Sequence, residues 1–497
     1  MIRNALASTV GLSATARACI LMTVLLGVLV FGAPALPASR LSAELDAIIG
    51  SPHLKGSAFG LTVYSVNQGR FICEVNGSRP LVPASNQKLL VTAAALIELG
   101  PDFTFTTKLY AAGSVKDGVL YGDLILRGGG DPNLSGRFNG GNVCYAVDAW
   151  VRAVQDAGIT QMTGRLVIDD LLYDTQFFHP SWPANQTHRW YAAGIGALSL
   201  NDNCIDLTIK PTSLGAPAEF AFEPYTPYIT VRNDCKTVSG KSTNNITISR
   251  RDREIYLGGT IGARSQGYSA SVAIHDPGLF AGAVFRDRLY EAGIRPAGVL
   301  RAERTPNYNS MRPLMEYHSQ DLATTLKVTN AQSQNFYANT LLKYLGARRF
   351  GQGSFENGIA AVRDILSSRG LLSDTVVIDD GCGLSHENRI STTDLVMVME
   401  SMYSSGYRDV YVGSLAVPGD PEGTLRRRLN GEQHSARIYA KSGYINNVKA
   451  LSGYVIRDDG EVLIFAFVVN KCASKSSWEV NNLQDRLMRS LSDCSMY

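Results

Sequence analysis

The chain has 497 residues, of which 45% are hydrophobic and 18% are charged, and its formal net charge is +3. This composition is typical of a folded globular protein and excludes a largely disordered chain, while the length predicts two to four domains. The balanced charge comes without a Lys/Arg stripe, so nucleic acid is not expected as a partner.

The N-terminus has the order of a secretory signal peptide. Arg3 and Arg17 precede an apolar run at 20–33, and small residues follow as far as Ala38. The run is short for a membrane span. We therefore expect residues 1–38 to be a cleaved signal peptide, with an uncleaved anchor as the alternative, and the protein to be periplasmic or secreted.

Seven cysteines follow the signal peptide, and in an exported protein they can form disulfides. Proximity in the sequence favours pairing Cys204 with Cys235 and Cys472 with Cys494, and the odd number leaves at least one thiol free. There is no Cys-x-x-Cys motif, and the His residues lack zinc-ligand spacing. No metal and no cofactor is therefore expected.

The predicted elements change character along the chain. A short helix at 41–49 and an alternating hairpin at 58–76 lead into an apolar helix that ends at Gly100. Short strands with turn signals then dominate from about residue 105, around one helix at 143–157. Helical periodicity returns at 276–294 and after about residue 320, before three closing strands and a last helix at 477–490. Strands at both ends predict one α/β domain, with the β-rich middle as an insertion.

Ser85 and Lys88 stand three residues apart at the start of the apolar helix. That helix has almost no polar face, so it is expected to be buried. Burying an ammonium is costly unless the group is paired or loses its proton. Lys88 is therefore either half of an ion pair or a base that takes the proton of the Ser85 hydroxyl.

Acyl transfer with a lysine base requires Ser-x-x-Lys, Ser-x-Asn and Lys-(Thr/Ser)-Gly on a strand. Lys441-Ser442-Gly443, at the end of a strand predicted at 436–440, supplies the third motif. Ser-x-Asn occurs at four serines, namely Ser65, Ser199, Ser242 and Ser333. We choose Ser333 with Asn335, because this pair follows a predicted helix at 322–328 in the segment that completes the α/β domain.

In these three motifs the chain resembles the class C low-molecular-weight penicillin-binding proteins, that is, D-alanyl-D-alanine carboxypeptidases and endopeptidases with large insertions. Five longer segments strengthen the resemblance, at 122–136, 197–211, 328–346, 378–392 and 414–429. The sequence departs from the family's pattern at Ser442, where Thr is usual, at Tyr444, where a small residue is common, and at Cys382.

The resemblance implies an α/β fold with a serine β-lactamase/penicillin-binding transpeptidase-like domain. This domain would be an antiparallel sheet flanked by helices, and a large β-rich insertion would form one or two extra domains. The expected division, after the signal peptide at 1–38, gives the catalytic domain 41–112 and 321–497, a first inserted domain 113–186 and 284–320, and a second, β-rich inserted domain 187–283.

The resemblance also implies a role for each motif residue. Ser85 would attack the carbonyl of a penultimate D-alanine, and Lys88, kept neutral by burial and by the charge of Lys441, would be the base. Ser333 would relay a proton to the leaving amine, and Asn335 would hold the substrate amide.

The strand motif would complete the site. Ser442 would bind the terminal carboxylate, and the backbone N–H groups of Ser85 and Tyr444 would form the oxyanion hole. Lys441 would supply positive potential, and Gly443, between Ser442 and Tyr444, would also belong to the substrate-binding residues. Tyr444 would narrow the site. Wall-shaping roles are expected for Asp379, Asp380, Gly381 and Arg389.

The function expected is a serine-type D-Ala-D-Ala carboxypeptidase or endopeptidase of the cell wall. Its partners would be peptidoglycan stem peptides and β-lactam antibiotics, the latter as covalent inhibitors, with peripheral membrane association as a further option. The alternatives are a β-lactamase that uses the same residues, and a non-catalytic relative that only binds the wall.

Overall fold

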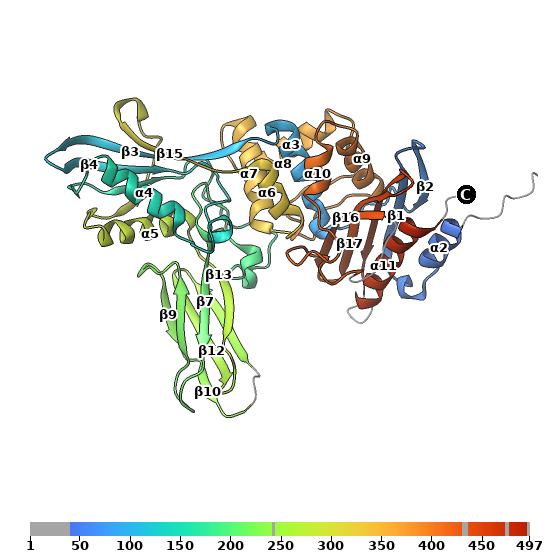
Figure 1. Cartoon of the computed structure of the whole chain (residues 1–497), viewed down its shortest axis with the longest axis horizontal. Helices are drawn as coiled ribbons and strands as arrows, with labels where there is room; N and C mark the ends of the chain where they lie inside the picture. The colour runs from blue at the N-terminus through green and yellow to red at the C-terminus, as the bar shows by residue number, and fades with distance from the viewer. Residues whose placement is uncertain (1–39, 241–243, 430–435, 473–476, 495–497) are drawn as a thin grey trace, which may run out of the picture.

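The structure is a computed structural model that describes residues 40–240, 244–429, 436–472 and 477–494. The molecule is elongated, with a helix-covered sheet at one end, a second sheet at the other end and a narrow lobe of strands that projects from the body (Figure 1). The signal peptide expected at 1–38 lies outside the described residues. Within the described ranges, no helix combines the length and the apolar character needed to cross a membrane.

The main sheet joins the two ends of the chain. Its strand order is β16-β17-β18-β1-β2, and every neighbouring pair is antiparallel. The strands are β1 (Ala58–Ser65), β2 (Arg70–Val75), β16 (Ala436–Ile445), β17 (Val448–Arg457) and β18 (Val462–Asn470). All nine residues of β18 are buried, because helices cover both faces of the sheet.

The two faces carry different helices. The helices α2 (Arg40–Ile49) and α11 (Ser477–Asp493) cover one face, where they contact Phe465 and its neighbours. A larger helical layer covers the other face and packs against Ile464 and Ala466. The larger layer contains α3 (Lys88–Leu99), α6 (Leu322–Asn330), α7 (Asn335–Phe350), α8 (Phe355–Ser367), α9 (Thr392–Tyr403) and α10 (Arg408–Gly413).

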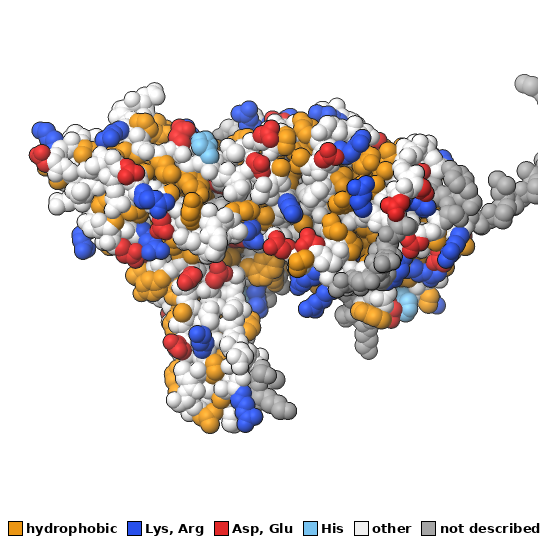
Figure 2. All heavy atoms as spheres, in the orientation of Figure 1, with side chains coloured by type: hydrophobic (Ala, Val, Ile, Leu, Met, Phe, Trp, Pro, Cys, Tyr) orange, Lys and Arg blue, Asp and Glu red, His pale blue; other side chains and the backbone are white. Residues whose placement is uncertain are grey.

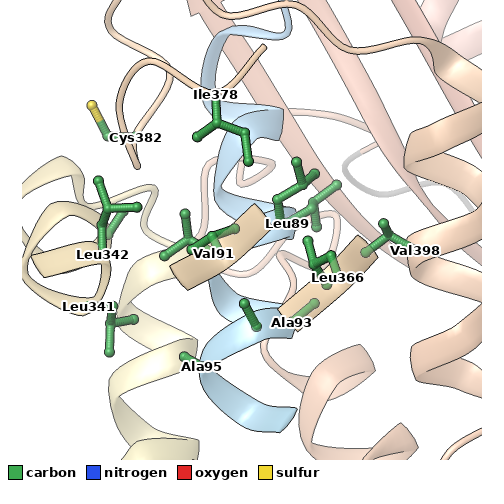
Figure 3. Close-up of a cluster of buried hydrophobic side chains, with 14 of the residues drawn as sticks. Leu89, Val91, Ala93, Ala95, Leu341, Leu342, Leu366, Ile378, Cys382 and Val398 are labelled. Carbon is green, nitrogen blue, oxygen red and sulfur yellow. The ribbon is translucent and has the colours of Figure 1, made fainter. Parts of the chain in front are cut away.

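Helix α3 runs through the centre of this layer, as its apolar sequence predicts. Its first nine residues, from Lys88 to Leu96, are all buried. Figure 3 shows its small and aliphatic side chains surrounded by side chains of α7, α8 and α9, among them Leu341, Leu342, Leu366 and Val398. The position of α3 is therefore fixed by contacts on every side, which holds the residue at its N-terminus in place.

The second sheet lies at the far end of the molecule. Its main path is β14-β6-β4-β3-β15, with β5 paired to β4. The strands are β3 (Thr104–Lys116), β4 (Val119–Arg127), β5 (Gln161–Met162), β6 (Leu166–Asp169), β14 (Val299–Arg301) and β15 (Arg312–Asp321). The helices α4 (Tyr145–Asp156) and α5 (Pro277–Glu291) pack beside it through residues such as Trp150 and Phe285, whose rings meet edge to face.

The projecting lobe is built from two smaller sheets. One has the order β13-β7-β8, and the other has β10-β12-β11 with β9 paired to β12. The strands are β7 (Cys204–Lys210), β8 (Glu219–Glu223), β9 (Thr230–Asn233), β10 (Lys236–Val238), β11 (Asn245–Arg251), β12 (Glu254–Gly262) and β13 (Tyr268–Ala273). On the face shown in Figure 2, acidic and basic side chains are interspersed over both the lobe and the body.

We propose that the chain divides as the sequence predicts, into a catalytic domain and two inserted domains. The strands β3 and β15 and the helix α5 continue across the expected boundaries at residues 112, 320 and 283. Connections of this kind would join the domains through continuous elements rather than through loose linkers.

The expected disulfides are not formed. Cys204 and Cys235 are both free thiols and both are buried, and Cys494 is likewise free, so neither expected pair exists. Proximity along the chain favoured these pairs, but a disulfide requires the two Cα atoms to lie within about 7 Å, which sequence spacing does not determine.

Candidate active site

Ser85 lies in a short 3₁₀ turn, Ala84–Gln87, directly before α3. We expected it in the helix itself; the chain instead leaves helical geometry at Ala84, whose φ of 47° is left-handed. Two glycines allow this turn to be enclosed. A Cβ at Gly383 would lie 1.8 Å from the Ala84 carbonyl oxygen, and one at Gly443 would lie 3.0 Å from the Ser85 nitrogen. Ser85 is thus held between two glycine backbones.

Lys88 is the first residue of α3 and is fully buried. Its Nζ lies 3.0 Å from Ser85 Oγ, 2.7 Å from Asn335 Oδ1 and 2.8 Å from the backbone oxygen of Cys382. None of these three partners carries a charge, so the atoms around Nζ do not form the ion pair that was one of the two alternatives. Burial lowers the pKa of Lys88 to about 8.

A second buried lysine faces Ser333. Lys441 Nζ donates to Ser333 Oγ at 2.8 Å and to the backbone oxygen of Ser442 at 2.9 Å. Burial lowers the pKa of Lys441 well below its usual value, and the charge of Lys88 lowers it further. For Lys88 the lowering of the pKa comes from burial, while Cys382 and Asp380 act in the opposite direction; the expected contribution from the charge of Lys441 is not among the causes.

Ser333 and Asn335 lie where α6 ends and α7 begins. Ser333 has a left-handed φ of 61°, which places a strained backbone conformation at the site. Asn335 is held at both ends of its amide: Oδ1 accepts from Lys88, and Nδ2 donates to the backbone oxygen of Tyr191 at 2.7 Å. The amide that was expected to hold substrate therefore also joins α7 to the inserted part of the chain.

The strand β16 passes through the motif Lys441-Ser442-Gly443 rather than ending before it. Ala440 exchanges backbone hydrogen bonds with Ala416 on the side away from β17, at 2.9 and 3.1 Å. Because backbone groups alternate in direction along a strand, the N–H groups of Ser442 and Tyr444 point to the same open edge. This edge faces the Ser85 turn, where the carbonyl of a substrate would lie.

The side chains at this edge differ in exposure. The Ser442 hydroxyl donates to Thr424 Oγ1 at 2.9 Å, so a threonine from a neighbouring loop supports it. Tyr444 is 65% exposed, and Lys449 Nζ lies 4.0 Å from the centre of its ring. Tyr444 therefore stands at the rim of the site beside Lys449 instead of closing over Ser85.

A buried carboxylate organises the loop that presents the Cys382 carbonyl. Asp380 accepts hydrogen bonds from the backbone nitrogens of Gly383, Leu384 and Ser385 and from Trp182 Nε1. The Cys382 thiol also lies 3.3 Å from Asp380, and burial raises its pKa, so it remains a protonated and unreactive thiol. The chemical contribution of Cys382 is its backbone oxygen.

These residues border a cavity of about 650 Å³. It is lined by Ser85, Ser333, Asn335, Ser442 and Tyr444, and by residues that the sequence did not single out: Pro183, Gln186, Trp190 and Tyr191 from the inserted part, together with Gly383, Leu384, His386 and Thr424. The adjacent aromatic residues Trp190 and Tyr191 are the feature of the sequence that could have indicated this inserted wall. They belong to none of the three catalytic motifs, so the sequence analysis did not select them.

The hydroxyl, amine and backbone N–H groups of this site are the chemical groups that acyl transfer uses. No group of three His, Cys, Asp or Glu side chains suited to a metal ion occurs among the described residues. A hydroxyl within hydrogen-bond distance of a buried amine, beside backbone N–H groups at an open strand edge, is the arrangement that acyl transfer by a serine with a lysine base requires.

Comparisons with known proteins agree with this class. Residues 41–491 match the D-Ala-D-Ala carboxypeptidase 3 (S13) family, so the chain belongs to that family. It is 29% identical over 445 residues to a D-alanyl-D-alanine carboxypeptidase of Actinomadura sp. (strain R39), covering 87% of this chain and 81% of the relative. It is 24% identical over 428 residues to the D-alanyl-D-alanine carboxypeptidase DacB of Haemophilus influenzae, covering 84% and 86% of the two chains.

The fold is similarly shared. The crystal structure of penicillin-binding protein 4 from Haemophilus influenzae superposes with a TM-score of 0.76 at 22% identity, covering 91% of this chain and 98% of that one. The expected α/β fold, with its antiparallel sheet, flanking helices and β-rich additions, is confirmed. The comparisons also confirm the expected family, the class C low-molecular-weight penicillin-binding proteins. They confirm the expected enzyme class as well, a serine-type D-alanyl-D-alanine carboxypeptidase.

Proposed function

We propose that Ser85 is the nucleophile of this carboxypeptidase and that Lys88 is its base. The observation that carries the proposal is the 3.0 Å contact between Lys88 Nζ and Ser85 Oγ. A neutral amine has two N–H donors and one lone pair. Asn335 Oδ1 and the Cys382 carbonyl can only accept, so they take the two donors and leave the lone pair for the Ser85 hydroxyl.

The acylation step follows from these contacts. Ser85 Oγ attacks the carbonyl carbon of the penultimate D-alanine while its proton moves to Lys88 Nζ. The negative charge that develops on the carbonyl oxygen is met by the backbone N–H groups of Ser85 and Tyr444. A pKa of about 8 suits Lys88 for this task, because the base is then partly neutral near pH 7.

The leaving group departs on the opposite side. The nitrogen of the terminal D-residue takes a proton from Ser333 Oγ, and Lys441, 2.8 Å away, replaces that proton. The C–N bond breaks, the terminal D-amino acid leaves, and an ester joins the remaining peptide to Ser85. Water then attacks the ester by the same route in reverse, which restores the Ser85 hydroxyl.

The substrate proposed is the stem peptide of peptidoglycan, with its terminal carboxylate at Ser442 and Thr424. These two hydroxyls are linked at 2.9 Å at the end of the cavity formed by β16. We also propose export to the periplasm or cell exterior, because the first 38 residues have the order of a signal peptide. Peripheral association with the membrane stays a prediction.

The decisive experiment is covalent labelling with radioactive penicillin. The mature protein should form one long-lived adduct, and Ser85→Ala should form none while keeping the melting temperature of the wild type. Ser368→Ala, an exposed serine at the end of α8, is the matched control and should label fully.

Two further readouts separate the alternatives. Rapid turnover of the penicillin adduct would favour a β-lactamase. Release of D-alanine from a pentapeptide analogue distinguishes the enzyme from a relative that only binds the wall. Undiminished labelling of Ser85→Ala would overturn the assignment of the nucleophile.

A further inference from the structure

The loop that carries Ser333 is held from both sides by one ion pair of the inserted part. Arg137 Nη1 donates to Gln332 Oε1 at 2.6 Å, and Gln334 Nε2 donates to Asp202 Oδ2 at 3.4 Å. Arg137 Nη2 donates to the same Asp202 oxygen at 2.7 Å. The side chains directly before and directly after Ser333 therefore both end on the Arg137–Asp202 pair.

Ser333 needs such support because its backbone is strained. Its φ of 61° is left-handed, and a residue other than glycine keeps such a conformation only where the surrounding contacts impose it. The contact that prepares Ser333 for proton transfer is the 2.8 Å hydrogen bond between its Oγ and Lys441 Nζ. A displacement of about 1 Å would be enough to spoil that alignment.

The two segments that supply the ion pair are fixed to each other. The backbone nitrogen of Asn201 donates to the backbone oxygen of Leu134 at 2.8 Å, which joins the segment of Asp202 to the segment of Arg137. Residues 201–203 have φ values of 50°, 52° and 55°. They are Asn, Asp and Asn, the residues that enter the left-handed region most readily after glycine. The sequence of this turn therefore suits its conformation.

The arrangement depends on the shape of an arginine side chain. A guanidinium presents several N–H groups in a planar fork, so Arg137 can donate to an amide oxygen and to a carboxylate at once. The ring of Tyr337, on α7, lies 5.8 Å from its Cζ atom. The side chains of Arg137 and Asp202 are 26% and 19% exposed, so water screens their attraction and the pair adds little to stability. Its contribution is to fix the direction of the side chains that it binds.

We propose that Arg137 is a positioning residue for the proton relay to the leaving group, and that Asp202 orients it. Arg137 acts through Gln332, which keeps Ser333 Oγ aligned with Lys441. In the proposed division of the chain, Arg137 and Asp202 belong to different inserted domains and Ser333 belongs to the catalytic domain, so both insertions contribute to the reaction. This inference rests on the proposed function, because the relay through Ser333 is part of it.

The test compares two substrates that have the same acyl group and different leaving groups. In an acyl-D-alanyl-D-alanine peptide, the departing nitrogen takes a proton from Ser333 Oγ as the C–N bond breaks. In the matching thioester the C–S bond breaks and the sulfur leaves as a thiolate, which needs no proton. The ratio of kcat/KM for the peptide to kcat/KM for the thioester does not depend on how much of a sample is folded. A purely structural role would therefore leave this ratio unchanged.

Removal of the positioning contact should lower the ratio. Ser333→Ala, which removes the relay itself, should lower it about 100-fold. Arg137→Ala should lower it about tenfold, and Arg137→Lys, which keeps the charge but loses the fork, should recover only part of that loss. Gln332→Ala should match Arg137→Ala, and the double variant should lower the ratio no further, because the two residues act as one unit. Gln332→Ala leaves the ion pair intact, so it tests the same link if Arg137→Ala fails to fold.

The matched control is Arg286→Ala. Arg286 Nη2 pairs with Asp287 at 2.6 Å in α5, where the two side chains are 26% and 18% exposed, much like Arg137 and Asp202. The ratio for this variant should stay within about twofold of wild type. An unchanged ratio for Arg137→Ala would overturn the inference, and so would effects of Arg137→Ala and Gln332→Ala that multiply in the double variant.

The same measurements separate this inference from the proposed function. If the wild type forms no penicillin adduct and releases no D-alanine, the proposed function fails. If Ser333→Ala leaves the ratio unchanged, the relay fails and the inference fails with it. If Ser333→Ala lowers the ratio and Arg137→Ala does not, only the positioning role of Arg137 fails.

Discussion

The two walls of the catalytic cavity are built in different ways. The wall with Ser85 and Ser333 is backed by Lys88 and Lys441, whose fully buried side chains are fixed by α3 and the main sheet. The opposite wall is the inserted segment around Trp190, which has only short 3₁₀ turns and is 45% exposed at Trp190. The difference indicates that the proposed reacting groups are held rigidly, whereas the inserted wall, which we expect to contact the substrate, is a more adaptable surface.

The largest effect is expected at the rigid wall. Lys88→Met keeps the length and the burial of the side chain but removes the proposed base, so the rate of acylation by penicillin should fall about 10³-fold. Stopped-flow or quenched labelling measures this rate.

The matched control is Lys343, another buried lysine, whose Nζ pairs with Asp174 at 2.7 Å. Lys343→Met should lower the melting temperature, because Asp174 loses its partner, and should leave the acylation rate of the remaining folded protein near wild type. If both variants lost acylation equally, burial of a lysine rather than its position at Ser85 would explain the effect.

A tenfold effect is expected from pH. The proposed base is the neutral form of Lys88, and that form becomes more abundant as the pH rises through the pKa of about 8. The acylation rate constant should therefore rise about tenfold between pH 7 and pH 9 and then level off. A rate that falls over this range would contradict a neutral lysine base, and the residual rate of Lys88→Met should not show the rise.

The smallest effect is expected where the two walls meet. Trp182 Nε1 donates to Asp380 Oδ2 at 2.9 Å, which links the inserted segment to the loop that presents the Cys382 carbonyl. Trp182→Phe removes one donor from a buried carboxylate and should lower the free energy of unfolding by about 1–3 kcal/mol, measured in urea. Trp478→Phe, at a tryptophan that is 67% exposed, is the control and should leave stability unchanged. Unchanged stability of Trp182→Phe would mean that the walls are independent.

The sequence predicted the rigid wall well and the adaptable wall poorly. Ser85, Lys88, Ser333 and Lys441 belong to short motifs, and the apolar pattern after Lys88 indicated its burial. The Cys382 and Tyr191 carbonyls could not be found this way, because every residue has a backbone oxygen and only the tertiary fold selects these two. The same limit explains the failed disulfides, since closeness along the chain did not bring Cys204 and Cys235 into bonding geometry.

The pairing of Ala58 with Asn470 has a consequence for when the protein becomes active. A chain that emerges from its N-terminus presents Ser85 and Lys88 early, but β16 and β18 arrive only with the last part of synthesis. Until then the main sheet on which the helical layer around α3 packs is incomplete, and a lysine in water has a pKa near 10.4 and is protonated. Contacts over such sequence distances form slowly and late. We therefore expect the proposed nucleophile and base to become reactive only after the last strands have been synthesised and have joined the sheet.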